Sequence, residues 1–229
     1  MGITNSTTDF IEYKNSFVKK NEYDFTIALA GNPNVGKSTV FNALTGMHQH
    51  TGNWPGKTVS TASGFCKYKD KNFLLVDIPG TYSLMSNSEE EEIARDYICF
   101  GNPTLTVVVV DATCLERNLN LVYQIFEITR NVIVCVNLLD EAEKKGIKIN
   151  LKQLSDELGV PVVGTTASKP KTLKKLLDTI YNVCTGSITS NPKKVIYSSV
   201  IENCLDSLQI TLNYSRLFIK MDLFKITRW

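Results

Sequence analysis

The sequence predicts an α/β protein in which helices cover both faces of an open, mostly parallel sheet. From Phe25 onward, short runs rich in β-branched residues alternate with helical segments, which is typical of repeated strand–helix–strand units. The runs Leu105–Val110 and Val132–Val136 are apolar throughout, as expected for central parallel strands that are covered on both sides. A polar turn at Tyr68–Lys71, between two strand runs, predicts one antiparallel hairpin at an edge of the sheet.

The predicted elements follow one another in a regular order along the chain. Strands are expected at Phe25–Ala30, Thr58–Tyr68, Asn72–Asp77, Thr104–Asp111, Asn131–Asn137 and Val160–Thr165. Helices are expected at Lys37–Leu44, Glu89–Phe100, Leu119–Thr129, Leu151–Leu158 and Thr172–Tyr181. The connections between parallel strands are expected to be right-handed crossovers.

The length of 229 residues allows one main domain with a small appendage. Residues 1–23 are polar and irregular, which indicates a loose leader, and residues 24–186 carry the strand–helix alternation. The composition changes after that point. We therefore expect a partial helical subdomain over residues 187–229, with the chain ending inside it.

Within this tail, Ser187–Asn191 is typical of a linker. The segments Val195–Leu208 and Tyr214–Ile226 are expected to form two helices. The first has apolar residues at mostly helical spacing, so it needs a surface to pack against.

Composition and charge exclude several classes of function. The net charge of +2 comes from 25 basic and 23 acidic residues spread along the chain, so no basic face for a nucleic acid is expected. The 6 cysteines lie far apart without a CxxC pair, which favours buried, reduced thiols in the cytoplasm over a disulfide framework or metal site. No stretch approaches the roughly 18 apolar residues of a membrane helix, and the N-terminus lacks the apolar core of a signal peptide. The chain as given is expected to be soluble.

The segment Gly31-Asn-Pro-Asn-Val-Gly-Lys-Ser38 fits the pattern GxxxxGK[ST], between a strand that ends at Ala30 and a helix that begins near Lys37. Such a loop wraps phosphates with its backbone N–H groups, so it needs glycines where a Cβ would block close approach. The helix N-terminus adds its positive end, Lys37 reaches the β- and γ-phosphates, and the Ser38 hydroxyl binds Mg²⁺. The motif in this context predicts a nucleoside triphosphate site.

A second phosphate motif, Asp77-Ile-Pro-Gly80, follows a strand as DxxG should. Asp77 is expected to hold Mg²⁺ through water, and the Gly80 N–H to contact the γ-phosphate, which makes the next segment a nucleotide sensor. Thr58 is expected to close the Mg²⁺ shell when GTP is bound. It follows the loop His48–Lys57, whose glycines and proline predict that it can move.

The segment Asn137-Leu-Leu-Asp140 follows a predicted strand and indicates guanine recognition. Asp140 can accept two hydrogen bonds, from guanine N1–H and N2–H, whereas adenine has no donor at N1, so ATP would be rejected. Leu138 stands where the commoner pattern NKxD has lysine, so weaker binding and faster exchange are expected. Thr166-Ala167-Ser168, after the last strand, is placed to offer a backbone N–H to guanine O6. Together the motifs predict a Ras-like P-loop GTPase fold.

The predicted site residues fall into groups by role. The nucleotide-binding group comprises Gly31, Asn32, Pro33, Asn34, Val35, Gly36, Lys37, Ser38, Thr39, Gly56, Lys57, Thr58, Val59, Asp77, Ile78, Pro79, Gly80, Asn137, Leu138, Leu139, Asp140, Thr166, Ala167 and Ser168. The catalytic group contains Lys37, Thr58 and Gly80, and Mg²⁺ is expected at Ser38, Thr58 and Asp77. His48 and His50 lack a third ligand nearby and are interpreted as solvated, and Trp54 as an exposed loop aromatic.

With these motifs in order, the chain resembles the GTPase domain of the ferrous iron transport protein B (FeoB) family. The resemblance rests on the NxxD motif without lysine and on Gly52-Asn-Trp-Pro-Gly56, Asp77-Ile-Pro-Gly-Thr-Tyr-Ser-Leu84, Ala94-Arg-Asp-Tyr97 and Val110-Asp-Ala-Thr-Cys-Leu-Glu-Arg-Asn-Leu119. It covers Phe25 to Tyr181 and thins in the tail, where Ser215-Arg216 and Ile219-Lys220 resemble part of the family's helical regulatory subdomain.

The resemblance implies a K⁺-stimulated GTPase. Asn34 would coordinate K⁺ beside the phosphates as a catalytic residue, with backbone carbonyls near Asn53 and Trp54 completing the site. Thr81 stands where Ras-like enzymes have the glutamine that orients the attacking water. K⁺ would then supply the positive charge that an arginine finger supplies elsewhere.

The resemblance also implies a cellular setting. GTP hydrolysis would regulate Fe²⁺ uptake through a membrane permease domain outside this chain, at the cytoplasmic face of the bacterial inner membrane. The implied partners are GTP, GDP and that domain, without nucleic acid, and homo-oligomerisation is left open. Two alternatives remain: a ribosome-assembly or tRNA-modification GTPase, which normally keeps NKxD beside an RNA-binding or modification domain, and a non-catalytic module whose contacts depend on nucleotide.

Overall fold

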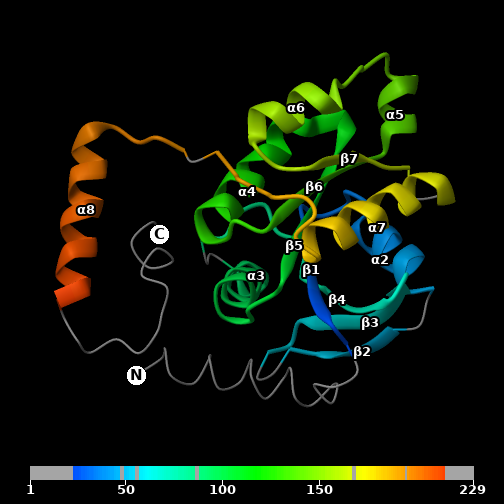
Figure 1. The fold of residues 1–229 in the computed structure, drawn as a ribbon, viewed down its shortest axis with the longest axis horizontal. Helices are drawn as coiled ribbons and strands as arrows, with labels where there is room; N and C mark the ends of the chain where they lie inside the picture. Colours follow the sequence, from blue (N-terminus) through cyan, green and yellow to red (C-terminus); the bar gives the residue numbers. More distant parts are fainter. Residues whose placement is uncertain are drawn as a thin grey trace.

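The computed structural model describes residues 23–46, 49–54, 57–85, 88–166, 169–193 and 195–214. These residues form a sheet with helices on both faces and a further helix that stands apart from the sheet (Figure 1). The predicted leader, apart from Tyr23, and the second predicted tail helix beyond Tyr214 lie outside the described residues.

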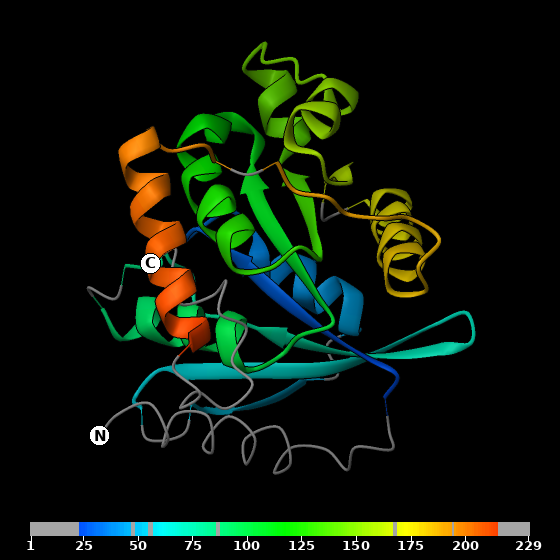
Figure 2. The same ribbon diagram turned by 60° about the vertical axis from the view of Figure 1, so that its left-hand side comes forward.

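The sheet of the described residues has 7 strands in the order β2-β3-β4-β1-β5-β6-β7. Their bounds are Phe25–Gly31 (β1), Gln49–Asn53 (β2), Ser60–Tyr68 (β3), Lys71–Asp77 (β4), Leu105–Asp111 (β5), Val132–Asn137 (β6) and Val162–Gly164 (β7). Strands β4, β1, β5, β6 and β7 pair in parallel, whereas β2 and β4 both run antiparallel to β3. The predicted hairpin is confirmed, and β3 and β4 extend beyond the other strands in Figure 2.

The helices are divided between the two faces, as the sequence predicts. Their bounds are Lys37–Thr45 (α2), Glu89–Phe100 (α3), Leu115–Ile128 (α4), Leu139–Lys144 (α5), Leu151–Leu158 (α6), Pro170–Cys184 (α7) and Ser199–Tyr214 (α8), with a 3-10 turn at Ala112–Cys114 (η1). Helices α2 and α7 lie on one face, and α3 and α4 on the other (Figure 1). Alternate residues of β5 serve the two cores: Val107 packs with the side of α2 and α7, and Val108 with that of α3 and α4.

Two predicted boundaries near the first loop are wrong. Strand β2 occupies part of the loop that was predicted to be mobile, and the strand predicted from Thr58 begins only at Ser60. The residues of β2 are polar or glycine and carry no alternation of apolar side chains that would predict a strand. The segment is a strand because it pairs with β3, with Asn53 opposite Ser60 and Thr51 opposite Ala62.

The interpretation of Trp54 as an exposed aromatic is also wrong. Its side chain is 2% exposed and lies edge-on to Tyr97 of α3, with 5.3 Å between ring centroids. The Trp54 N–H donates to the carbonyl of Val59, and its own carbonyl accepts from the N–H of Lys57. Trp54 therefore anchors the loop that carries Lys57 and Thr58, called the first switch loop below, to the α3 face of the sheet.

Two helices differ from the predicted ones in extent. Helix α4 begins at Leu115, one turn before the predicted start at Leu119, and α5 was not predicted. The short segment of α5 carries four charged residues and one buried alanine, so it has no apolar stripe from which a helix could be read.

The predicted linker after Gly186 is fixed to the main body. The N–H groups of Asn191 and Lys193 donate to the carbonyls of Gly159 and Leu158, and the Ser190 hydroxyl donates to the carbonyl of Val132. Helix α8 then begins at Ser199 rather than Val195 and runs without a break to Tyr214, beyond the predicted end at Leu208.

We expect the amides of α8 to exchange with solvent faster than those of β5 and β6. Val200 and Leu208 of α8 are 70% and 54% exposed, so opening of this helix loses few buried apolar contacts, whereas β5 and β6 lie in the core. Native-state hydrogen exchange of dilute protein, read by mass spectrometry on peptides from both regions, checks this. Equal protection of α8 and β6 would show that another surface covers the helix in solution.

The parallel strands bring their carboxyl ends to one edge of the sheet. Gly31 ends β1, Asp77 ends β4, Asp111 ends β5 and Asn137 ends β6. The register places Asp111 level with Asn137, whereas Asp77 lies opposite Leu29 and Gly31 opposite Val109, so the ends are staggered by about two residues from β4 to β1 and from β1 to β5. Ligands of open α/β sheets bind at this edge.

The cysteine prediction is only partly confirmed. Within the described residues, Cys66, Cys99 and Cys135 are buried thiols, but Cys114 and Cys204 are exposed. Burial raises the pKa of Cys135 to about 12, which makes that thiol unreactive at neutral pH. Among the described helices, none combines the length and apolar character needed to cross a bilayer.

Candidate nucleotide-binding site

The loop between β1 and α2 is shaped by two glycines that cannot be replaced without collision. Gly31 and Gly36 have φ angles of +155° and +80°, which other residues rarely adopt. A Cβ on Gly31 would lie 2.4 Å from the carbonyl oxygen of Val109, and one on Gly36 would lie 2.4 Å from Nδ2 of Asn137. The glycines of the predicted motif are therefore required by the packing of the loop as well as by room for phosphate.

A pocket of about 460 Å³ opens in front of this loop. Its described lining residues are Asn32, Pro33, Asn34, Gly36, Lys37, Ser38, Thr39 and Gly80. The first turn of α2 faces this pocket, so the positive end of the helix dipole and the free N–H groups of that turn are directed to one place. The Oδ1 atom of Asn32 is buried there without a hydrogen-bond partner among the described residues, which leaves an acceptor for a bound group.

The charged core of the site is an ion pair between Lys37 and Asp77. The side chains of Lys37 and Asp77 are only 10% and 15% exposed. Burial raises the pKa of the Asp77 carboxyl above its ordinary value, and the Lys37 ammonium and the Ser38 hydroxyl oppose that rise. A hydroxyl and a carboxylate side by side are the hard oxygen donors that Mg²⁺ prefers, so Ser38 and Asp77 fit the predicted metal role.

The DxxG segment packs directly against the phosphate loop. The N–H of Ile78 donates to the carbonyl of Leu29, and that of Thr81 to the carbonyl of Gly31. A Cβ on Gly80 would lie 3.2 Å from Cα of Pro33, so only glycine fits here without displacement. Thr81 is 4% exposed and its hydroxyl donates to the carbonyl of Ser83, so it does not reach into the pocket.

Asn137 binds protein at both ends of its amide. It is fully buried, its Nδ2 donates to the carbonyl of Val35 at 3.0 Å, and its Oδ1 accepts from the Thr165 hydroxyl at 3.1 Å. This residue therefore ties the phosphate loop to the ends of β6 and β7. Asp140 lies in the first turn of α5 and is half-buried, and the preceding turn places Leu138 in the left-handed region with φ 59°.

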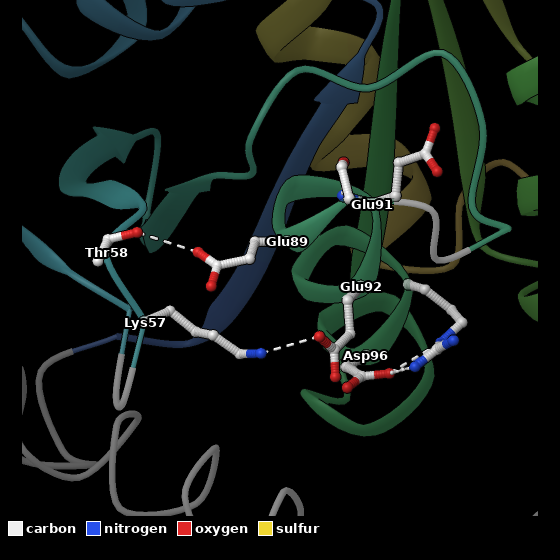
Figure 3. A network of polar contacts seen from close by, with 8 residues as sticks. Lys57, Thr58, Glu89, Glu91, Glu92 and Asp96 are labelled. Atoms are coloured by element: carbon white, nitrogen blue, oxygen red, sulfur yellow. Dashed lines mark hydrogen bonds and ion pairs between the residues drawn. The ribbon is translucent and has the colours of Figure 1, made fainter.

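The predicted switch threonine lies away from the pocket. Thr58 is exposed, and its hydroxyl donates to Oε2 of Glu89 at 3.0 Å (Figure 3). Beside it, Nζ of Lys57 lies 2.8 Å from Oε2 of Glu92, whose hydrogen bond raises the pKa of the lysine. Thr58 is not among the residues that line the pocket with Ser38, so the structure does not bring the three predicted Mg²⁺ residues together.

Residues 25–180 match the family model described as ferrous iron transport protein B. The chain belongs to the FeoB family. It is 38% identical over 206 residues to the Fe(2+) transport protein A/Fe(2+) transporter FeoB fusion protein of Porphyromonas gingivalis, a match that covers 86% of this chain and 24% of that protein. It is 42% identical over 187 residues to the Fe(2+) transporter FeoB of Escherichia coli, covering 80% of this chain and 24% of that one.

Solved structures agree with this assignment. The cytosolic domain of the T. maritima FeoB iron transporter in a GDP form matches with a TM-score of 0.80 and 35% sequence identity, over 89% of this chain and 78% of that one. The predicted Ras-like GTPase fold of this FeoB chain is therefore confirmed. The chain spans about a quarter of the length of the curated relatives reported above, at 24% of each.

The K⁺ residues implied by the resemblance are only partly assembled in this FeoB chain. Asn34 has φ 65°, is exposed and lines the pocket. Asn53 ends β2 and Trp54 follows it, but neither lines the pocket, and the Trp54 carbonyl accepts from the Lys57 N–H at 3.0 Å. Within the described part of the chain, no three or more His, Cys, Asp or Glu side chains gather into a group that could hold a metal ion.

Of the predicted segment Thr166-Ala167-Ser168, the structure describes only Thr166. Thr166 is buried and accepts from the N–H of Lys169. Gly56, Ala167 and Ser168 lie outside the described residues, as does His48.

Sequence reasoning missed three contacts around the switches. The hydroxyl of Ser83 donates to Glu91, the N–H of Leu84 donates to the Gln124 side chain, and Arg117 lies over the Tyr82 ring. No local pattern predicts them, because each joins the segment after DxxG to α3 or α4.

Proposed function

We propose that this chain binds GTP and GDP with Mg²⁺ and hydrolyses GTP to GDP and phosphate. The single observation that carries the proposal is the pocket in which Lys37, Ser38 and Gly80 meet at the start of α2, with Asp77 paired to Lys37 behind it. The T. maritima relative described in a GDP form supports guanine nucleotide as the ligand.

The phosphates would replace contacts that the protein now makes with itself. Lys37 pairs with Asp77 in this structure, and a β- or γ-phosphate would draw its ammonium toward the helix N-terminus. Asp77 would then be free to accept from the hydration shell of a bound cation, with the Ser38 hydroxyl beside it. The N–H of Gly80 would contact the γ-phosphate, since Gly80 lines the pocket and the DxxG segment is hydrogen-bonded to β1.

Guanine would be selected by Asp140, whose carboxylate can accept from both N1–H and N2–H. The network of Asn137, Thr165 and Val35 keeps the loop of Asp140 in fixed relation to the phosphate loop. Leu138 lacks the ammonium of the usual lysine, so we expect weaker nucleotide binding and faster exchange than NKxD proteins show.

Hydrolysis would rely on positive charge from bound cations, because no side chain of the DxxG segment supplies it. Thr81 occupies the position of the Ras glutamine, but it is buried and its hydroxyl donates to the carbonyl of Ser83, so its side chain is not available to orient a water molecule. When bound, Mg²⁺ and K⁺ supply positive charge to the phosphate oxygens, where charge develops in the transition state. Asn34 is the residue of this chain that would face K⁺, because its side chain is exposed in the pocket.

GTP hydrolysis by this chain is expected to be at least about tenfold faster in KCl than in matched NaCl, with kcat rising more than KM falls. Asn34→Ala should lose the stimulation, whereas Asn203→Ala, an exposed asparagine on α8, should keep it. Phosphate release measured in both salts checks this. Equal wild-type rates would contradict the K⁺ role alone, and no turnover in either salt would indicate a non-catalytic nucleotide-dependent module.

We further propose that the chain regulates Fe²⁺ uptake through a membrane domain, at the cytoplasmic face of the membrane. The support is the family, whose curated members are described as Fe(2+) transporters of which this chain spans about a quarter. In this arrangement residues 24–186 form the nucleotide domain, and residues from 187 onward contribute to a helical subdomain.

A further inference from the structure

The first turn of α3 contacts two segments, the one that carries Lys57 and Thr58 and the one that follows DxxG. Ser88 caps the helix by accepting from the N–H of Glu91, and four glutamates follow it. Glu89 and Glu92 point toward Thr58 and Lys57, whereas Glu91 points away from them (Figure 3). Glu91 accepts instead from the hydroxyl of Ser83, after DxxG. The helix dipole stabilises glutamates in the first turn of a helix, but this stabilisation requires no partner on another segment.

The contacts of Glu89 and Glu92 hold Thr58, the residue that the proposed Mg²⁺ shell requires, on α3. Thr58 would have to bring its hydroxyl to the side of Ser38, yet that hydroxyl is bonded to Glu89 and the neighbouring Lys57 is paired with Glu92. Trp54, three residues before Lys57, is buried against Tyr97 of the same helix. The loop is thus held on α3 by the buried Trp54 side chain and by two polar contacts, those of Lys57 and Thr58, which can break while Trp54 stays buried.

We propose that Glu89 and Glu92 form a latch that holds Lys57 and Thr58 on α3, and that GTP with Mg²⁺ must break this latch to close the first switch loop. The inference rests on the proposed nucleotide function and adds a regulatory step to it. In the latched state the loop stays open and nucleotide enters and leaves freely. Release of the latch brings Thr58 to the phosphate end of the pocket.

The size of the effect follows from exposure. The Lys57 and Glu92 side chains are 32% and 42% exposed, and an ion pair that solvent reaches to this extent changes an equilibrium by about two- to fivefold. Glu92→Gln should therefore speed closure about threefold. Glu89→Gln leaves only a weaker, neutral acceptor for the Thr58 hydroxyl, so it should speed closure less, and the double variant should exceed either single one. Glu90→Gln is the matched control, because it removes the same charge from the same helix turn and Glu90 is exposed.

Trp54 provides the readout. The chain has 2 tryptophans, so Trp229→Phe leaves Trp54 as the single reporter beside the latch. In this background, stopped-flow fluorescence after mixing with Mg²⁺ and a non-hydrolysable GTP analogue gives the closure rate. Faster closure in Glu89→Gln and Glu92→Gln than in Glu90→Gln is the expected result, and equal rates in all three would overturn the latch.

A charge exchange tests the ion pair itself. Glu92→Lys places two ammonium groups together and should speed closure more than Glu92→Gln does, and adding Lys57→Glu should slow it again by restoring the pair. If the second substitution brings no slowing, the Lys57–Glu92 part of the latch is wrong.

A nucleotide-free measurement separates this inference from the proposed function. Acrylamide quenching of Trp54 in the absence of nucleotide should increase in Glu89→Gln and Glu92→Gln but not in Glu90→Gln, since the loop is then held by Trp54 alone. Unchanged quenching overturns the latch even where nucleotide binds normally. Failure of the wild-type protein to bind a fluorescent GDP analogue would instead contradict the proposed function, whatever the quenching shows.

Discussion

Lys37→Ala is expected to reduce affinity for GTP and GDP by at least about 100-fold and to abolish hydrolysis. The lysine is nearly buried at the start of α2, and its ammonium is the positive side chain among the described residues that line the pocket. A phosphate chain placed there without it keeps the helix dipole and backbone N–H groups but loses its main counter-charge. The variant also leaves the buried Asp77 carboxyl without its partner.

Isothermal titration with GDP and with a non-hydrolysable GTP analogue measures this loss. Lys152→Ala, which removes an exposed lysine on α6, is the matched control and should bind as the wild type does. Circular dichroism shows whether Lys37→Ala is still folded. Normal hydrolysis by a folded Lys37→Ala variant would remove this pocket from the mechanism.

Asp140→Asn is expected to lower affinity for GTP by about 10²- to 10⁴-fold, because two charge-assisted hydrogen bonds to guanine are lost and an amide N–H faces the N2–H group. The same change should raise affinity for xanthosine triphosphate, whose C2 carbonyl accepts from an amide. Asp140 is half-buried in the first turn of α5, which keeps its carboxylate partly out of water.

Competition among GTP, xanthosine triphosphate and ATP against a fluorescent GDP analogue gives the three affinities. Glu143→Gln removes an exposed carboxylate from the same short helix and should leave the order of preference unchanged. Equal binding of ATP and GTP by the wild type would show that the guanine assignment is wrong.

Local sequence was sufficient to predict an element or motif wherever the residues of one short segment determine its structure. The loop Gly31–Ser38 and the motif Asp77–Gly80 are recognised directly from their residues. The strands that end at Asp111 and Asn137 were placed correctly because they are apolar and β-branched. The order of these segments was enough to predict the fold and the edge of the sheet where the site lies.

Local sequence failed where an element owes its structure to a partner. Strand β2 is polar and forms because β3 supplies its hydrogen bonds, and α5 is short and charged and packs through Ala142. Trp54 in a loop of glycines and proline was interpreted as exposed, although Tyr97 on α3 buries it.

By itself, then, the sequence determined the fold and the phosphate and base motifs of this FeoB chain, since backbone conformation and side-chain chemistry there depend on near neighbours. Only the tertiary structure decided that Asn137 binds Val35, 102 residues away in the chain, and that Thr58 lies on Glu89 rather than beside Ser38. The physical reason is that a hydrogen bond between distant segments depends on how the sheet and helices are packed, and local patterns of residues do not encode that packing.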